Sequence, residues 1–188
     1  RDLVRTLERL FRRAEIPLAM SQGFHPKMRM TIPSALALGI VGCDEVLDVQ
    51  LAEELSSETV HARLAAHVPP GMTIKCVEHL SPEARKARVE SATYQVQFPP
   101  ERRPALQTAI DELLAQESFL IERPGAKKKL ELMTDLEQLH LTDDAIVFTL
   151  RIRPEGAIRA PEVLEAFGVA DLDALGNPLA RTQLELAT

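Results

Sequence analysis

One short segment of the sequence combines residue types that bind anions and move protons. It reads Ser21-Gln22-Gly23-Phe24-His25-Pro26-Lys27, and Arg29 follows it. Glycine permits backbone conformations that other residues resist, and proline fixes the one after the histidine. A phenylalanine ring can stack on a nucleic-acid base, a histidine can donate or shuttle a proton, and cationic side chains position phosphates. The segment is therefore the candidate site for an anion or a base.

Two other interpretations of this segment stay open. In the first, Phe24 packs into the core and His25 is an ordinary surface histidine; composition alone gives this interpretation about even weight, because single loop histidines are common. In the second, His25 is the general acid or base of a metal-independent enzyme that cleaves RNA. A second titratable or cationic group within hydrogen-bond reach of His25 would favour the enzyme.

A predicted helix over residues 2–14 supplies the second candidate feature. Its apolar residues recur at helical spacing, and Pro17 ends it. The residues expected to face inward are Leu3, Val4, Leu7, Leu10, Phe11 and Ala14. The opposite face carries Arg1, Arg5, Arg9, Arg12 and Arg13. Charged helix faces are usually just solvated, but arginine suits bidentate phosphate contacts, so Arg9, Arg12 and Arg13 join the candidate binding residues.

The charge of the chain is unevenly distributed. The formal net charge is −6, yet residues 1–40 hold seven basic and three acidic residues, a balance of +4, so the remaining 148 residues sum to −10. An acidic chain does not coat nucleic acid indiscriminately. The local excess of positive charge fits one anionic ligand near the start of the sequence.

The remaining composition is typical of a cytoplasmic globular protein. Hydrophobic residues make up 45% and charged residues 27% of the chain, and no stretch approaches the roughly 18 to 20 apolar residues of a membrane span. No signal-peptide pattern is present. Cys43 and Cys76 fit no zinc or C-x-x-C pattern, and two thiols cannot ligate an iron–sulfur cluster. We expect two reduced, buried thiols, and no metal or cofactor on this chain.

The predicted elements are those of an α+β protein in which one pattern occurs twice. In the first half, the helix over 2–14 is followed by strands over 27–32 and 46–51, a helix capped by Ser56, and a strand over 72–76. A strand before Arg1 would complete βαββαβ, the ferredoxin-like unit. Because the numbering also starts at an arginine, we expect this first strand to lie upstream and to be missing from it.

The second half repeats the pattern after a polar, proline-marked linker over 81–91. The predicted strands cover 92–98, 119–121, 128–133, 146–152 and 182–186, and the helices cover 102–116 and 161–167. A turn at Pro124-Gly125-Ala126 separates two of these strands. The prediction is therefore two ferredoxin-like units in tandem, over residues 1–80 and 92–188.

The first half also resembles a known family. The residues that carry the resemblance are Asp2-Leu3, Arg12-Arg13-Ala14, Pro17-Leu18-Ala19, the segment 21–27 with Arg29, Leu36-Ala37-Leu38-Gly39, the run 45–51, and Pro69-Pro70-Gly71-Met72. Over 2–80 they are similar to the opening of the bacterial "radical SAM-linked" family. The resemblance implies a partner, a radical SAM enzyme that carries the cluster. That family's upstream serine–histidine lies outside this numbering, and residues 130–133 depart from its aspartate–isoleucine–arginine-like stretch.

These observations predict a non-catalytic accessory module that works with a radical SAM enzyme and binds an anionic substrate, with RNA as the preferred candidate. The loop 21–27, Arg29 and the arginine face would make the contacts. The preference for RNA rests on charge, on the loop and on analogy with other paired ferredoxin-like RNA binders. With no Trp, one Tyr and six Phe, the stacking platform of a typical RNA-recognition motif is not visible. The alternatives are the RNA-processing enzyme that uses His25 and a pure protein-docking module.

Overall fold

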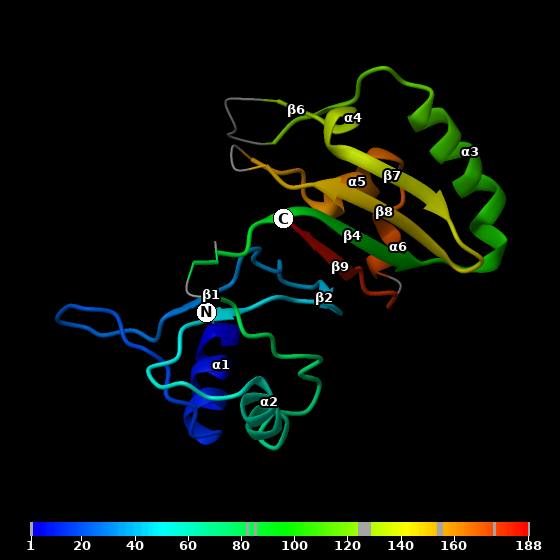
Figure 1. The fold of residues 1–188 in the computed structure, drawn as a ribbon. Coiled ribbons are helices and arrows are strands. Elements are labelled where there is room, and N and C mark those ends of the chain that lie inside the picture. The colour runs from blue at the N-terminus through cyan, green and yellow to red at the C-terminus, as the bar shows by residue number, and fades with distance from the viewer. Residues whose placement is uncertain are drawn as a thin grey trace. The chain divides into compact units, whose positions relative to one another are not determined.

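The protein has an α+β fold in which helices and strands are interspersed along the chain (Figure 1). The structure, a computed structural model, describes residues 2–81, 83–84, 86–123, 129–153, 156–174 and 176–187. The chain forms two compact units. The first comprises Arg1–Ile32 and Leu47–Lys86, and the second comprises Pro33–Val46 and Ala87–Thr188. The second unit thus includes a segment that lies inside the first half of the sequence. The domain limits at residues 80 and 92 stay a prediction.

The first unit begins with helix α1 (Asp2–Arg13), which confirms the helix expected from the apolar spacing. Leu7, Leu10 and Phe11 are buried in the core of this unit. Leu3 and Val4 are not: they are 44% and 38% exposed, so the expectation that they face the core was wrong. The core contacts the later turns of α1, and no described element covers its first turn.

Helix α1 ends in a backbone motif that explains how the chain turns toward the loop. The Ile16 N–H donates to the Phe11 carbonyl at 3.1 Å, and the Glu15 N–H donates to the Arg12 carbonyl at 3.2 Å. This pair of bonds is the Schellman motif, which places the residue after the cap in the left-handed region. That residue is Glu15, with φ of 53°, where glycine is usual. The Arg63 guanidinium donates to the Glu15 carbonyl at 3.0 Å and so binds this turn to the second helix.

The strands of the first unit are shorter than predicted. β1 (Met30–Thr31) pairs antiparallel with β3 (Asp48–Val49). Helix α2 (Ser57–Ala65) begins at the predicted cap, where the Ser56 hydroxyl accepts from the Thr59 N–H at 3.2 Å. The strand predicted over 72–76 was wrong: its apolar residues are half-buried, but this described segment joins no ladder. Alternating burial alone does not make a strand, because a strand also needs a hydrogen-bonded neighbour.

A five-stranded sheet forms the second unit. Its strands are, in spatial order, β2 (Val41–Gly42), β9 (Ala180–Leu186), β4 (Val89–Gln97), β8 (Ala145–Arg151) and β7 (Leu136–Leu141). β2 runs parallel to β9, and the other neighbours are antiparallel. Three predicted strands are confirmed with shifted ends, as β4, β8 and β9. β2 and β7 were missed, and β4 begins inside the predicted linker.

Helices pack against one face of this sheet. α3 (Arg103–Leu114) follows the short 3-10 helix η1 (Pro100–Arg102), and α5 (Ala160–Ala166) and α6 (Asp171–Ala174) precede β9. Buried leucines, isoleucines and valines of α3 and α5 share one core with Val96, Phe148 and Leu150 of the strands. In that core the Tyr94 and Phe148 rings stack at 5.5 Å between centroids.

A separate ladder joins β5 (Leu120–Ile121) and β6 (Leu130–Glu131) in the second unit. The predicted turn at Pro124-Gly125-Ala126 lies outside the described residues. Where we expected the strand over 128–133 to continue, α4 (Leu132–Asp135) begins instead. The Glu131 side chain explains this change of direction, since it accepts from the Met133 N–H and caps the new turn.

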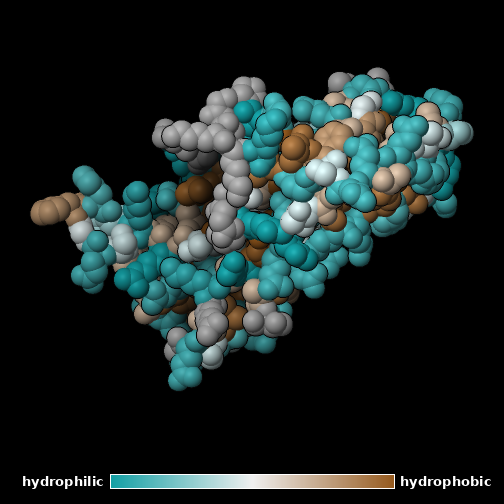
Figure 2. Space-filling view, turned by 90° about the horizontal axis from the view of Figure 1, so that it is seen from above, coloured by the Kyte–Doolittle hydropathy of each residue, from teal (hydrophilic) through white to brown (hydrophobic). Residues whose placement is uncertain are grey.

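The surface of the described chain is mainly polar on the face seen in Figure 2, where hydrophobic residues form small separate areas. No described helix combines the length and the apolar character that crossing a membrane requires. Cys43 and Cys76 are free, as expected, but both are exposed. The expectation that the thiols are buried was therefore wrong.

Candidate functional site

The loop over residues 21–27 is a closed projection of the first unit. The Ser21 N–H donates to the Lys27 carbonyl at 2.8 Å, and the Lys27 N–H donates to the Ser21 hydroxyl at 2.9 Å. An antiparallel bridge between Met20 and Met28 continues the closure below them. Five residues, 22–26, therefore form a tip between two fixed ends. The loop projects at the left of Figure 1.

The tip presents an aromatic side chain to solvent. Phe24 is 102% exposed, so it lies outside the core and the packing interpretation of this residue was wrong. Gly23, with φ of 134°, precedes it in a conformation that L side chains rarely adopt. Gln22, His25, Pro26 and Lys27 are exposed as well, and Ser21 is half-buried at the base. Figure 2 shows hydrophobic atoms at the end of the projection on the left.

Two cations stand at the base of the loop. The backbone of Lys27 closes the loop, and its side chain is exposed. The Arg29 guanidinium donates from Nη1 to the Gln50 Oε1 at 2.9 Å, and the Arg29 N–H donates to the Ala19 carbonyl at 2.8 Å. Arg29 is thus oriented by two neighbouring segments, and its side chain is exposed. No acidic residue occurs in the sequence between Glu15 and Asp44.

The arginine face of α1 is exposed, as expected. Arg5, Arg9, Arg12 and Arg13 are all exposed, and the Arg9 Nε donates to the Arg5 carbonyl at 3.2 Å. Within the described part of the chain, none of these four forms an ion pair with a carboxylate. No hydrogen bond among the described residues links them to the loop. The structure therefore places the loop and the arginine face in one unit without a direct bond between them. Arg1 lies outside the described residues.

The two units differ strongly in charge. The unit that carries the loop holds eleven basic and nine acidic residues, a balance of +2, whereas the other unit holds eleven basic and nineteen acidic residues, a balance of −8. An anionic ligand is attracted to the first and repelled by the second. The formal charge therefore favours the first unit as the location of the candidate anion site.

Among the described residues, none is hydrogen-bonded to the His25 side chain to form a catalytic pair. Its ring makes no hydrogen bond with any residue that the structure describes. General acid–base catalysis needs a base or acid within hydrogen-bond reach of the reacting group, and a second group usually orients it. Whether the loop binds a ligand or cleaves RNA stays a prediction.

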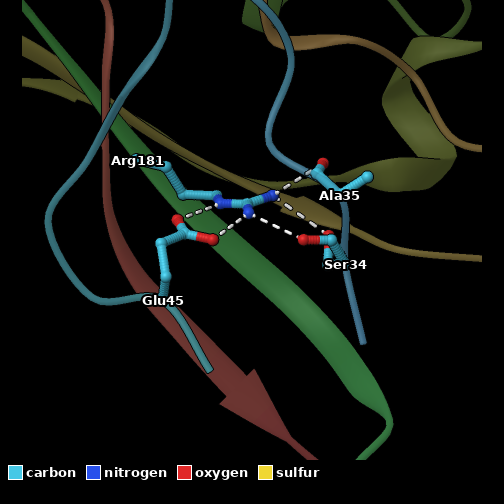
Figure 3. A network of polar contacts seen from close by, with 4 residues as sticks. All are labelled: Ser34, Ala35, Glu45 and Arg181. Carbon is cyan, nitrogen blue, oxygen red and sulfur yellow. Dashed lines mark hydrogen bonds and ion pairs between the residues drawn. The ribbon is translucent and has the colours of Figure 1, made fainter. Parts of the chain in front are cut away.

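Sequence reasoning missed the most completely bonded polar side chain of the second unit, Arg181 of β9. It is 2% exposed, and Figure 3 shows how its guanidinium joins residues of the segment 33–46. Nε donates to Glu45 Oε1 at 2.8 Å, and Nη2 also bonds Glu45 Oε2. Nη2 donates to the Ser34 carbonyl at 2.9 Å, and Nη1 donates to the Ser34 hydroxyl at 3.0 Å and the Ala35 carbonyl at 3.5 Å. We call this network the Arg181 clasp.

The ion pair with Glu45 determines the protonation state of Arg181. Burial by itself lowers the pKa of Arg181, but the hydrogen bonds and charge of Glu45, together with Tyr94, outweigh it and the pKa is raised. The arginine is therefore charged and fully paired, and it has no donor to spare for a ligand. The clasp holds the segment 33–46 in place and is not a binding site. Its partners lie 136 residues apart, which no local sequence signal could reveal.

One shallow pocket lies on the first unit, lined by Ser57, Glu58, His61 and Val77. The His61 Nε2 atom is hydrogen-bonded to the Ile74 carbonyl oxygen at 3.2 Å. Hydrogen bonds to its own backbone N–H and to Ser56 lower the pKa of Glu58 at the helix start. These bonds are local, and no group of metal-binding side chains occurs among the described residues. The pocket therefore offers no built site for a ligand.

The fold and the loop thus define an α+β protein with a projecting, positively charged loop, and comparison with known proteins gives the family. The model of the family DUF2344, described as an uncharacterized protein conserved in bacteria, matches residues 1–159. The match covers most of the chain, so the protein belongs to this family. The comparisons with curated proteins and with solved structures found no match.

Proposed function

We propose that this protein is a non-catalytic accessory module that binds an anionic substrate, RNA in the first place, through the loop 21–27 and the arginine face of α1. The observation that carries the proposal is the loop itself. Its base is closed by the two Ser21–Lys27 hydrogen bonds, and its tip is fully exposed. The loop lies in a stretch of 28 residues without a carboxylate, and its exposed tip contributes nothing to the packing of the core. An exposed hydrophobic residue in such a place favours a binding role.

The cations support the same proposal. Arg5, Arg9, Arg12 and Arg13 have no carboxylate partner among the described residues, so binding a phosphate costs no existing ion pair. Arginine donates to phosphate in a bidentate manner and is weakly hydrated, which suits it to nucleic-acid contacts. The balance of +2 in this unit against −8 in the other favours binding of such a ligand to this unit.

The test is the salt dependence of RNA binding. We expect binding to total bacterial RNA at low salt, weakening steeply as salt rises because counterions are released. The double variant Arg12→Ala/Arg13→Ala should bind more weakly and show a smaller salt slope. The matched control is Arg88→Ala/Arg159→Ala, which removes the same charge from exposed positions of the other unit. Absence of RNA binding at low salt contradicts the proposal, as does equal weakening in the control.

A protein-docking module is the second candidate, and the exposed Phe24 and Leu3 favour it. On this alternative, the arginine face binds the partner enzyme and not RNA. Arg9→Glu then abolishes association with the partner, while RNA affinity is absent in the variant and the wild type alike. The RNA-processing enzyme is the third candidate, and an RNA-cleavage assay on the pure protein, with His25→Ala beside it, tests it directly.

The partner and the finer fold belong to the same proposal. A radical SAM enzyme as partner rests on the resemblance of residues 2–80, and location in the cytoplasm rests on composition. Two ferredoxin-like units in tandem remain our hypothesis for the fold, although residues 72–76, predicted as the last strand of the first unit, join no ladder among the described residues. Support comes from the second unit, where β4, α3, β7, β8, α5 and β9 follow one another and the sheet order is β9-β4-β8-β7.

A further inference from the structure

Phe24 is the one aromatic residue of the protein that is available to a ligand. The chain has six phenylalanines, one tyrosine and no tryptophan. All seven aromatic residues lie in the described part of the chain. Phe11, Tyr94, Phe98, Phe148 and Phe167 are buried and Phe119 is partly buried in the core, whereas Phe24 is 102% exposed. An aromatic ligand that stacks on this protein therefore stacks at the tip of the loop.

The loop presents this ring to solvent. The bonds between Ser21 and Lys27 fix both ends, so only the five residues of the tip can move. Within the tip, Gly23 adopts a φ of 134° that side chains with a Cβ atom rarely allow, and the ring of Pro26 fixes its own φ. Preorganisation of this kind reduces the entropy lost on binding. The ring is presented to a ligand from outside the chain.

The charges around the ring select the ligand. Lys27 and Arg29 stand on the same loop base, and the nearest acidic residues in the sequence are Glu15 and Asp44. An aromatic ring beside cations that can reach a phosphate backbone is the arrangement by which proteins bind unpaired nucleotides. A base inside a duplex is already stacked and paired, so its face is closed to Phe24.

We infer that the anionic ligand of this protein is single-stranded nucleic acid, bound with one unpaired base stacked on Phe24 and the neighbouring phosphates on Lys27 and Arg29. This inference rests on the proposed function and narrows its substrate class from RNA in general to an unpaired segment. One exposed ring means one stacked base, so the site is short and tolerant of sequence. The arginines of α1 make further contacts with phosphates and do not contribute to the recognition of bases.

The test compares a labelled oligouridylate with a blunt RNA duplex of equal phosphate number, by fluorescence anisotropy at low salt. We expect tighter binding of the single strand. Phe24→Ala should weaken it roughly 5- to 150-fold, the range for loss of one stacked base, and should leave the duplex unchanged. Phe24→Leu, which stays apolar but has no ring, should lose about as much as Phe24→Ala. Folding is not at risk, because the ring touches no core residue.

A second variant gives a direct optical signal. The protein has no tryptophan, so the fluorescence of Phe24→Trp comes from the loop tip alone. Stacking should quench this fluorescence on the single strand and not on the duplex, with affinity retained. The control is Leu38→Ala, which removes a side chain that is 103% exposed on the other unit and should change nothing.

The outcomes separate this inference from the proposed function. Equal binding of strand and duplex, with no loss in Phe24→Ala, overturns the stacked base while anion binding by the arginines stands. Full affinity in Phe24→Leu also overturns it and indicates an apolar contact of the kind made with a protein. No binding of either probe by the wild type overturns both proposals together.

Discussion

Arg181 and Glu45 form a two-bonded ion pair across 136 residues of sequence, with Nε and Oε1 at 2.8 Å. The arginine side chain is 2% exposed and the glutamate side chain 30%. The pair fixes the segment 33–46 to β9, and the parallel bonds from the N–H groups of Val41 and Cys43 continue the attachment. A segment from between β1 and β3 is thus part of the second unit's sheet.

The Arg181 clasp should be a main source of stability for the second unit. Glu45→Ala leaves the buried guanidinium without its counter-charge, which typically costs about 3 to 5 kcal/mol, and the lower figure applies here because Glu45 is partly exposed. Arg181→Lys should also destabilise, since an ammonium cannot replace five N–H donors in a fixed plane. Urea unfolding monitored by far-ultraviolet circular dichroism measures both.

The control for the clasp is an exposed ion pair of the same sheet. Arg151 and Glu137 lie 2.8 Å apart, with side chains 53% and 31% exposed. Arg151→Ala should therefore cost less than about 1 kcal/mol. A cost equal to that of Glu45→Ala would mean that charge number, and not the buried network, determines stability.

The space around Gly42 of β2 is too small for a methyl side chain, so substitution by alanine should destabilise the protein. A Cβ atom there would lie 2.7 Å from Glu45 Cγ and 3.0 Å from Leu36 Cδ2. Gly42→Ala should push Glu45 away from Arg181 and destabilise by about 1 to 3 kcal/mol. In Glu45→Ala the nearest of these atoms is gone and only Leu36 Cδ2 remains, so adding Gly42→Ala should cost less. A double-mutant cycle on unfolding free energies measures this coupling, and additive costs would contradict the mechanism.

Glu15 offers a stabilising substitution. Its φ of 53° is unfavourable for a residue with a Cβ atom, while the bonds of the turn use only its backbone. Glu15→Gly should therefore raise the unfolding free energy by about 0.5 to 1 kcal/mol. The matched change Glu8→Gly, in the middle of α1, should lower it by about 1 kcal/mol. Thermal unfolding of both variants is the measurement, and destabilisation by both would show that Glu15 contributes through its side chain.

Lowering the pH should destabilise the second unit, in part through protonation of Glu162. Burial alone raises the pKa of this carboxyl, but hydrogen bonds from Arg123 and the Arg159 N–H outweigh it, so the pKa lies below the ordinary 4.5. A lowered folded-state pKa contributes stability above pH 4.5 that is lost as the pH falls below it. Glu162→Gln should reduce stability at neutral pH and flatten its decline below about pH 5. Melting temperatures across the acid range test this, and an unchanged slope contradicts it.

Patterns within short stretches of the sequence predicted several helices and strands of this protein. The apolar spacing of residues 3–14 predicted α1, the Ser56 hydroxyl predicted the start of α2, and alternation predicted the central strands β4 and β8. The candidate loop was also visible, because Gly23 and Pro26 interrupt regular structure wherever they occur. Each of these signals acts over a few residues, and in these elements the tertiary contacts agree with it.

Tertiary contacts decided the rest. β2 exists because Val41 pairs with Ala180, and Arg181 is buried because Glu45 and Ser34 meet it; each contact joins residues more than 130 positions apart. Residues 72–76 alternate as a strand should, but none of the described residues pairs with them in a ladder. Phe24 could equally well have packed in the core. The tertiary structure places it in solvent, at the tip of a loop that the Ser21–Lys27 hydrogen bonds close.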